Sequence, residues 1–164
     1  MEEIMFKWLA CLLVCLMASK TSCHLCLISP PQRGSMTGLN KPASDDCVLL
    51  KPPCGGRPAG KSSIILRAGQ NFTVTFQKNL NHFIPASPGE FNILIGEEQS
   101  QKFQSLAVVK DMNEPDLHLY TVNVTIPNFK LKEHLVLLAV YNTKNPEAPP
   151  MFYQCSDVII VDHI

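Results

Sequence analysis

The residues of this sequence best suited to chemistry are its histidines, and His24 stands at a special position. Residues 1–23 have the features of a secretory signal: a positive charge at Lys7, an apolar run over 8–18, and small residues at 21–23. Cleavage at the end of that segment would make His24 the first residue of the mature protein. An amino-terminal histidine offers two nitrogen donors, its α-amine and a ring nitrogen, so it could chelate a metal ion.

The cysteine count supports this cleavage point. Four of the seven cysteines remain once the segment 1–23 is removed, and an even number in a secreted chain indicates disulfides: Cys26, Cys47, Cys54 and Cys155. Cleavage before Cys23 would leave an odd thiol. The alternative is that His24 is simply the residue at which the peptidase cuts, with no metal involved.

The other histidines differ in their surroundings. His82 lies in a polar turn after the apolar pattern of 72–76, where a ligand could reach it; the alternative is an ordinary solvated loop histidine. His118 and His134 sit in strand patterns beside apolar neighbours, which favours structural roles. His163 lies at the chain terminus and is not a candidate.

Asp157 is the carboxylate that stands out. It follows Cys155 by two residues and precedes the apolar run 158–161, so it is held at the start of a core strand. The alternative is a charge that merely marks the strand end. The sequence shows no serine–histidine–acid set, no phosphate-binding glycine loop and no Cys-x-x-Cys pair.

Composition excludes several classes of function. Acidic and basic residues balance at 14 each in 164 residues, so there is no basic surface for nucleic acid and no charge block for a membrane. Residues 24–164 suffice for one domain and contain no second apolar run long enough to span a membrane. Two glycosylation sequons, at Asn71 and Asn123, fit a secreted, extracellular protein.

Strand patterns dominate the chain after a long loop. Short apolar or alternating runs predict strands near 25–28, 64–66, 72–76, 91–95, 106–109, 118–126, 134–141 and 152–161, with no sustained helical period. If Asn123 faces solvent, the period of two turns Tyr120, Val122, Val124 and Ile126 inward. The pattern predicts an all-β, antiparallel β-sandwich with residues 29–60 as a long loop tethered by cysteines.

Three motifs together resemble the copper acquisition factor family, secreted proteins related in fold to lytic polysaccharide monooxygenases. They are His24-Leu25-x-Leu27-x-x-Pro30-x-x-Arg33-Gly34, Pro53-Cys54-Gly55-Gly56, and Tyr153-Gln154-Cys155-x-Asp157. The resemblance implies an immunoglobulin-like β-sandwich that binds one copper ion in a histidine brace. The implied ligands are the amine and ring of His24, the ring of His82, and Asp157, which could instead hydrogen-bond a ligand histidine.

The resemblance also implies the disulfides. Cys54 and Cys155 both belong to family motifs and are expected to pair, and Cys26 and Cys47, which are additions to the family pattern, are expected to form the second bond. Two imidazoles, an amine and a carboxylate suit tetragonal copper(II). The α-amine must lose a proton to bind, so copper affinity should fall in acid.

Three functions remain in competition. We expect a secreted monomer that captures or transfers copper without turnover, with a cell-surface copper transporter as a candidate partner. The alternatives are a copper-dependent polysaccharide monooxygenase and an adhesive β-sandwich without metal. Residues 24–164 contain no tryptophan and only three tyrosines, which disfavours the aromatic surface that a polysaccharide-oxidising enzyme would present.

Overall fold

The computed structural model describes residues 24–60, 64–129 and 135–162. The predicted signal segment, His134 and His163 lie outside the described residues. Within them the chain forms eight strands and one short 3-10 helix. The strands are β1 (His24–Ser29), β2 (Ile64–Arg67), β3 (Asn71–Leu80), β4 (Glu90–Glu97), β5 (Lys102–Lys110), β6 (His118–Thr125), β7 (Leu135–Asn142) and β8 (Met151–Val161), and η1 is Asp45–Cys47.

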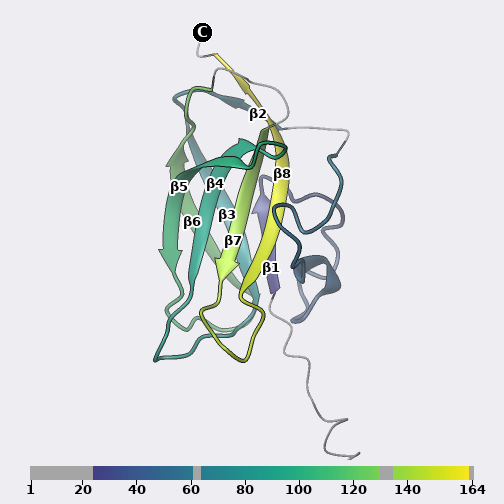
Figure 1. Cartoon of the computed structure of the whole chain (residues 1–164), viewed down its shortest axis with the longest axis vertical. Coiled ribbons are helices and arrows are strands. Elements are labelled where there is room, and N and C mark those ends of the chain that lie inside the picture. The colour runs from purple at the N-terminus through teal and green to yellow at the C-terminus, as the bar shows by residue number, and fades with distance from the viewer. Residues whose placement is uncertain (1–23, 61–63, 130–134, 163–164) are drawn as a thin grey trace, which may run out of the picture.

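The strands form two packed sheets, so the predicted β-sandwich is confirmed (Figure 1). One sheet has the order β1-β3-β6 and the other β2-β8-β7-β4-β5. All pairings are antiparallel except that of the edge strand β2, which runs parallel to the end of β8, with Ile64 opposite Val158. A parallel partner needs a long connection, and the sequence from β2 to β8 provides it.

An aromatic cluster fills the space between the two sheets. Phe76 of β3 stacks on Tyr120 of β6 with ring centroids 5.0 Å apart, and Phe91 of β4 stacks on Tyr141 of β7 at 4.3 Å. The inward face predicted for the strand around Asn123 is also confirmed, because Tyr120 and its alternate neighbours are buried or half-buried while Asn123 is exposed.

Strand β7 is apolar on both faces for a physical reason. Its inward residues join the main core, and its outward residues Val136, Leu138 and Val140 pack in a second cluster with Cys54 and Cys155. The loop before β2 therefore covers the outer face of the five-stranded sheet. A strand buried on both sides shows a continuous apolar run, as Leu135–Val140 does.

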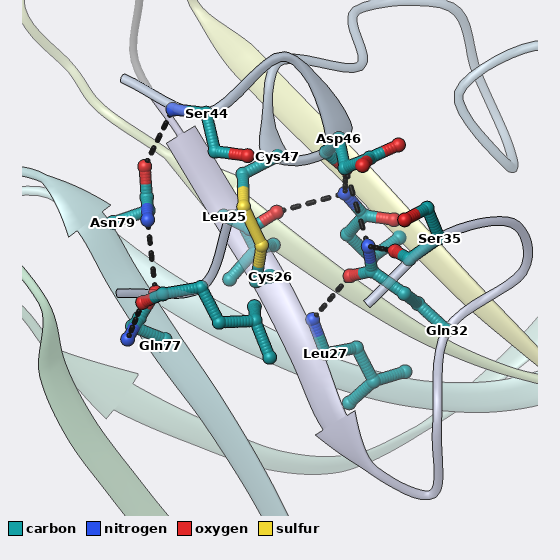
Figure 2. Close-up of a disulfide and its surroundings, with 12 residues drawn as sticks. Leu25, Cys26, Leu27, Gln32, Ser35, Ser44, Asp46, Cys47, Gln77 and Asn79 are labelled. Carbon is teal, nitrogen blue, oxygen red and sulfur yellow. Dashed lines mark hydrogen bonds between the residues drawn. A yellow bond between two sulfur atoms is a disulfide. The ribbon is translucent and has the colours of Figure 1, made fainter. Parts of the chain in front are cut away.

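Both predicted disulfides are confirmed, and they hold the long loop 29–60. Cys54 bonds Cys155 of β8, and Cys26 of β1 bonds Cys47. Polar side chains supply the other links, as Figure 2 shows around the second disulfide. The amide of Leu27 donates to Gln32 Oε1 at 2.9 Å, and Gln32 Nε2 donates to the carbonyl of Asp46 at 3.2 Å.

The described residues include no helix that is long and apolar enough to span a membrane.

Candidate metal centre

Strand pairing brings His24 and His82 to one end of the sandwich. His24 opens β1 and pairs opposite Leu80, the last residue of β3, and His82 follows Leu80 by two residues. Paired residues in antiparallel strands lie about 5 Å apart between Cα atoms, so the register places His24 beside Leu80, two residues before His82. Their relative exposures are 1% and 8%, respectively.

The buried nitrogens of this pair are the ones that a chelating site would use. Nδ1 of His24 and Nε2 of His82 both lie out of contact with solvent. Nδ1 is the ring nitrogen nearer the backbone, so in an amino-terminal histidine it and the α-amine can close a small chelate ring around one metal ion. Nε2 of His24 is too far from the amine to do so. This donor chemistry fits copper.

Asn81 shapes the turn that carries His82. Its Oδ1 accepts a hydrogen bond from the amide of Phe83 at 3.0 Å, which closes an Asx turn across His82. On the other side, Asn145 Nδ2 donates to the carbonyl of His82 at 3.0 Å. His82 is thus a buried residue in an ordered turn, so the alternative of a solvated loop histidine is wrong.

Asp157 occupies a different environment from the two histidines. Its carboxylate receives bonds from Arg33 Nη2 at 2.6 Å and Arg33 Nε at 3.0–3.1 Å, and from the amide of Gly60 at 2.8 Å. Among the described residues, no three His, Cys, Asp or Glu side chains gather as a metal site. The ligand role of Asp157 therefore stays a prediction, and the structure shows the residue in an ion pair.

The arrangement of the strands explains this separation. Gln154 of β8 donates to the carbonyl of Leu25 at 2.9 Å, so the start of β1 lies level with Gln154. Asp157 comes three residues later, about 10 Å further along an extended strand. Figure 1 shows β1 and β8 starting at the same end, with β8 running toward the opposite end, where β2 lies.

Arg33 is the centre of a network that the sequence did not reveal. Its side chain is buried and also pairs with Glu98 at 2.7 Å, while Nη1 donates to the carbonyl of Arg57 at 3.1 Å. Burial alone would lower the pKa of Arg33, but the hydrogen bonds and charges of Glu98 and Asp157 raise it above its usual range. The network fixes loop 29–60 against β8.

The strand pattern of the sequence contains a signal that Lys78 is buried. Lys78 shares the inward phase of the period-two pattern with Val74 and Phe76, and the structure buries it completely. An inward lysine predicts a buried counter-ion, although its identity cannot be obtained from the strand pattern.

The family model for "Lytic polysaccharide mono-oxygenase, cellulose-degrading" matches residues 29–158. The chain belongs to this family. The matched region begins after His24 and contains His82 and Asp157. The monooxygenase-like fold that the motifs implied is thereby confirmed, while membership of the copper acquisition factor family stays a prediction. Members of the lytic polysaccharide mono-oxygenase family bind a copper ion.

Solved structures of lytic polysaccharide monooxygenases are among those similar to this chain. A Jonesia denitrificans lytic polysaccharide monooxygenase shares 10% identity, covering 84% of this chain and 100% of that one, with a TM-score of 0.49. An AA10 enzyme from Streptomyces lividans shares 20% identity, covering 71% of this chain and 70% of that one, with a TM-score of 0.46.

A third solved structure is longer than this chain. An enzyme from Kitasatospora papulosa shares 17% identity over 63% of this chain, with a TM-score of 0.37, and the match spans only 53% of the enzyme's length. No curated protein matches the chain.

Proposed function

We propose that the mature chain binds one copper(II) ion through His24 and His82 and serves in copper capture or transfer without turnover. The observation that carries this proposal is that the register pairs His24, the predicted amino terminus, with Leu80, two residues before His82, so that two buried histidines lie at one end of the sandwich. Membership of a family whose members bind copper supports it.

In this site each chain group has a defined task. The α-amine and Nδ1 of His24 would supply two donors, and Nε2 of His82 a third. The amine must lose its proton and both imidazoles must be neutral before they can bind, so the chain releases protons when copper enters. The bound ion would supply a redox-active Lewis acid; the hydrogen bonds of Asn81 and Asn145 hold the turn of His82 in place.

The surroundings of the histidines favour binding over polysaccharide oxidation. Loop 81–89, loop 111–117 and loop 143–150 connect strands at this end, and within these described loops Phe83 is the only aromatic residue. A surface that holds a sugar chain in place usually presents several exposed aromatic rings, because their flat faces pack on the sugars. The loops at this end of the sandwich contain asparagines and carboxylates instead.

A polysaccharide monooxygenase is the second candidate, and the family model is the observation in its favour. An assay distinguishes the two functions: the copper-loaded protein is incubated with a reductant and chitin, cellulose or starch. Oxidised oligosaccharides that vanish in His24→Ala, detected by mass spectrometry, would establish the enzyme. Their absence, together with tight copper binding, would support capture or transfer.

Copper binding itself is tested on secreted protein without an amino-terminal tag. We expect one copper per chain by elemental analysis, and an electron paramagnetic resonance spectrum with nitrogen couplings. His24→Ala and His82→Ala should each lower affinity far more than His118→Ala, the control histidine. A parent-like His82→Ala beside a defective His118→Ala would refute the site.

The cellular setting belongs to the same proposal. We place the protein outside the cell as a monomer, with the copper ion as its ligand and a cell-surface copper transporter as the recipient. The two sequons and the two disulfides support an extracellular location. Size-exclusion chromatography of the secreted protein would test the monomer.

A further inference from the structure

Lys78 and Asp111 form an ion pair that is completely buried. Lys78 Nζ lies 2.7 Å from Asp111 Oδ1, and neither side chain is exposed. Removing two charges from water is costly, and well-packed apolar residues often stabilise a fold as well as such a pair does. Stability alone is therefore a weak explanation for this buried ion pair, and its hydrogen bonds to neighbouring residues suggest another role.

The pair reaches Asn81 by two routes. Lys78 Nζ donates directly to Asn81 Oδ1 at 3.2 Å. Asp111 Oδ1 accepts from the amide of Asn113 at 3.0 Å, and Asn113 Oδ1 accepts from Asn81 Nδ2 at 3.0 Å. The four residues thus close a ring of hydrogen bonds, in which Asn113 takes part through both its backbone amide and its side chain, and the ring links the end of β3 to loop 111–117.

Asn81 in turn fixes the backbone on both sides of His82. Its Oδ1 accepts from the amide of Phe83, one residue beyond His82, and its own amide donates to Asp116 Oδ1 at 2.6 Å. If Asn81 Oδ1 lost the charged donor Lys78, it would be freer to rotate, and the Asx turn across His82 would lose its anchor. Hydrogen bonds that involve a charged group are stronger than neutral ones.

We propose that Lys78 and Asp111 are positioning residues for His82, which hold its ring where the amino-terminal His24 can share a metal ion with it. The inference rests on the proposed copper site but adds residues that neither the motifs nor the family model assigns. They act through Asn81 and do not contact the metal. Groups that orient a metal-binding histidine typically change metal affinity about 10–100-fold when they are removed.

The main test is Lys78→Met, which keeps a long side chain and removes the charge and its donors. We expect copper affinity to fall about 10–100-fold, with altered nitrogen couplings in the copper(II) spectrum. In the metal-free protein, the amide of Phe83 should exchange with solvent faster than in the parent. The control is Ile95→Ala, a fully buried residue of β4 outside the ring, which should lower stability while leaving copper affinity and spectrum unchanged.

A double-variant cycle tests the route through Asn81. Lys78→Met combined with Asn81→Ala should lose no more affinity than the more affected single variant, because both remove the same anchor. If Lys78→Met does not fold, Asn113→Ala opens the ring without leaving a buried charge alone, and it should still lower affinity and speed the exchange of Phe83.

Three outcomes would overturn the inference. A folded Lys78→Met that matches the parent in affinity, spectrum and exchange would do so, as would Ile95→Ala losing as much affinity at equal stability, or additive losses in the cycle. If the parent binds no copper, the proposed function fails, and the Phe83 exchange rates still decide whether the ring orders the turn of His82.

Discussion

Arg33 and Asp157 lie 124 positions apart in the chain, yet Arg33 Nη2 sits 2.6 Å from Asp157 Oδ1. Arg33 belongs to the motif that begins at His24, and Asp157 to the motif that contains Cys155. This ion pair therefore connects the first and the third of the three sequence motifs. A carboxylate at position 157 can therefore be explained by the ion pair with Arg33 as well as by a role as a metal ligand.

Asp157→Asn separates these two roles. If the carboxylate serves the ion pair, the variant should lower the free energy of unfolding by about 1–3 kcal/mol, because the buried guanidinium loses part of its charged partner, and copper affinity should stay near that of the parent. Urea unfolding of metal-free protein and copper titration measure the two quantities. A large loss of affinity with unchanged stability would instead make Asp157 a direct ligand.

The second prediction concerns the start of the mature protein. Secreted material should begin at His24, because only then is the α-amine next to the ring nitrogen with which it chelates. Amino-terminal sequencing or intact mass determines the cleavage site. One glycine added before His24 should weaken copper binding sharply, since the amine becomes an amide. Equal affinity of the extended and native forms would rule out a chelating terminus.

A pH prediction follows from Glu114. Burial alone would raise its pKa, but hydrogen bonds from the Tyr120 hydroxyl and from backbone amides, together with the charge of Lys78, lower it below the usual value of 4.5. The folded state therefore favours the ionised carboxyl. Glu114 should stabilise the protein at pH values above 4.5, and this contribution should disappear as the pH falls through the lowered pKa.

Glu114→Gln measures that contribution. The variant should be less stable than the parent at neutral pH, and the difference should shrink as the solution is acidified, as followed by urea unfolding between pH 7 and the lowest pH at which the protein folds. Asp45→Asn, at an exposed position, serves as the control. A difference between variant and parent that does not change with pH would contradict the prediction.

The fourth prediction concerns the sequons, which face each other across β3 and β6. Thr73 donates to Asn123 Oδ1 at 2.6 Å, and Thr125 donates to Asn71 Oδ1 at 3.1 Å. Both contacts use the amide oxygen and leave Nδ2, the atom that carries a glycan, available. We expect glycans on both asparagines, side by side on an exposed face at the end of β3 farther from Leu80 and the histidines.

Intact mass before and after enzymatic deglycosylation counts these glycans. Asn71→Gln and Asn123→Gln should each remove one, and neither should change copper affinity, because the glycans lie at the opposite end of the strands from His24. Secreted protein that carries a single glycan in every molecule would show that the two sites exclude each other.

Much of the fold is determined by the sequence read locally. Alternation around Asn123 predicted the inward side chains of β6, because side-chain direction in a strand follows from the backbone period alone, and the apolar pattern of 134–141 predicted a strand where β7 lies. The cysteines also paired as the motifs implied. Here a local pattern or a motif carries all the information that the assignment needs.

The environment of the candidate site was decided only by tertiary structure. His82 lies in a polar turn that would be solvated in isolation, and it is buried because the turn packs at the end of the sandwich and Asn145 from a distant loop holds its carbonyl. The partners of Lys78 and Asp157 likewise come from strands and loops far along the chain. Strand periodicity fixes which way a side chain points, whereas the group that it meets depends on the register and packing of segments that are distant in the chain.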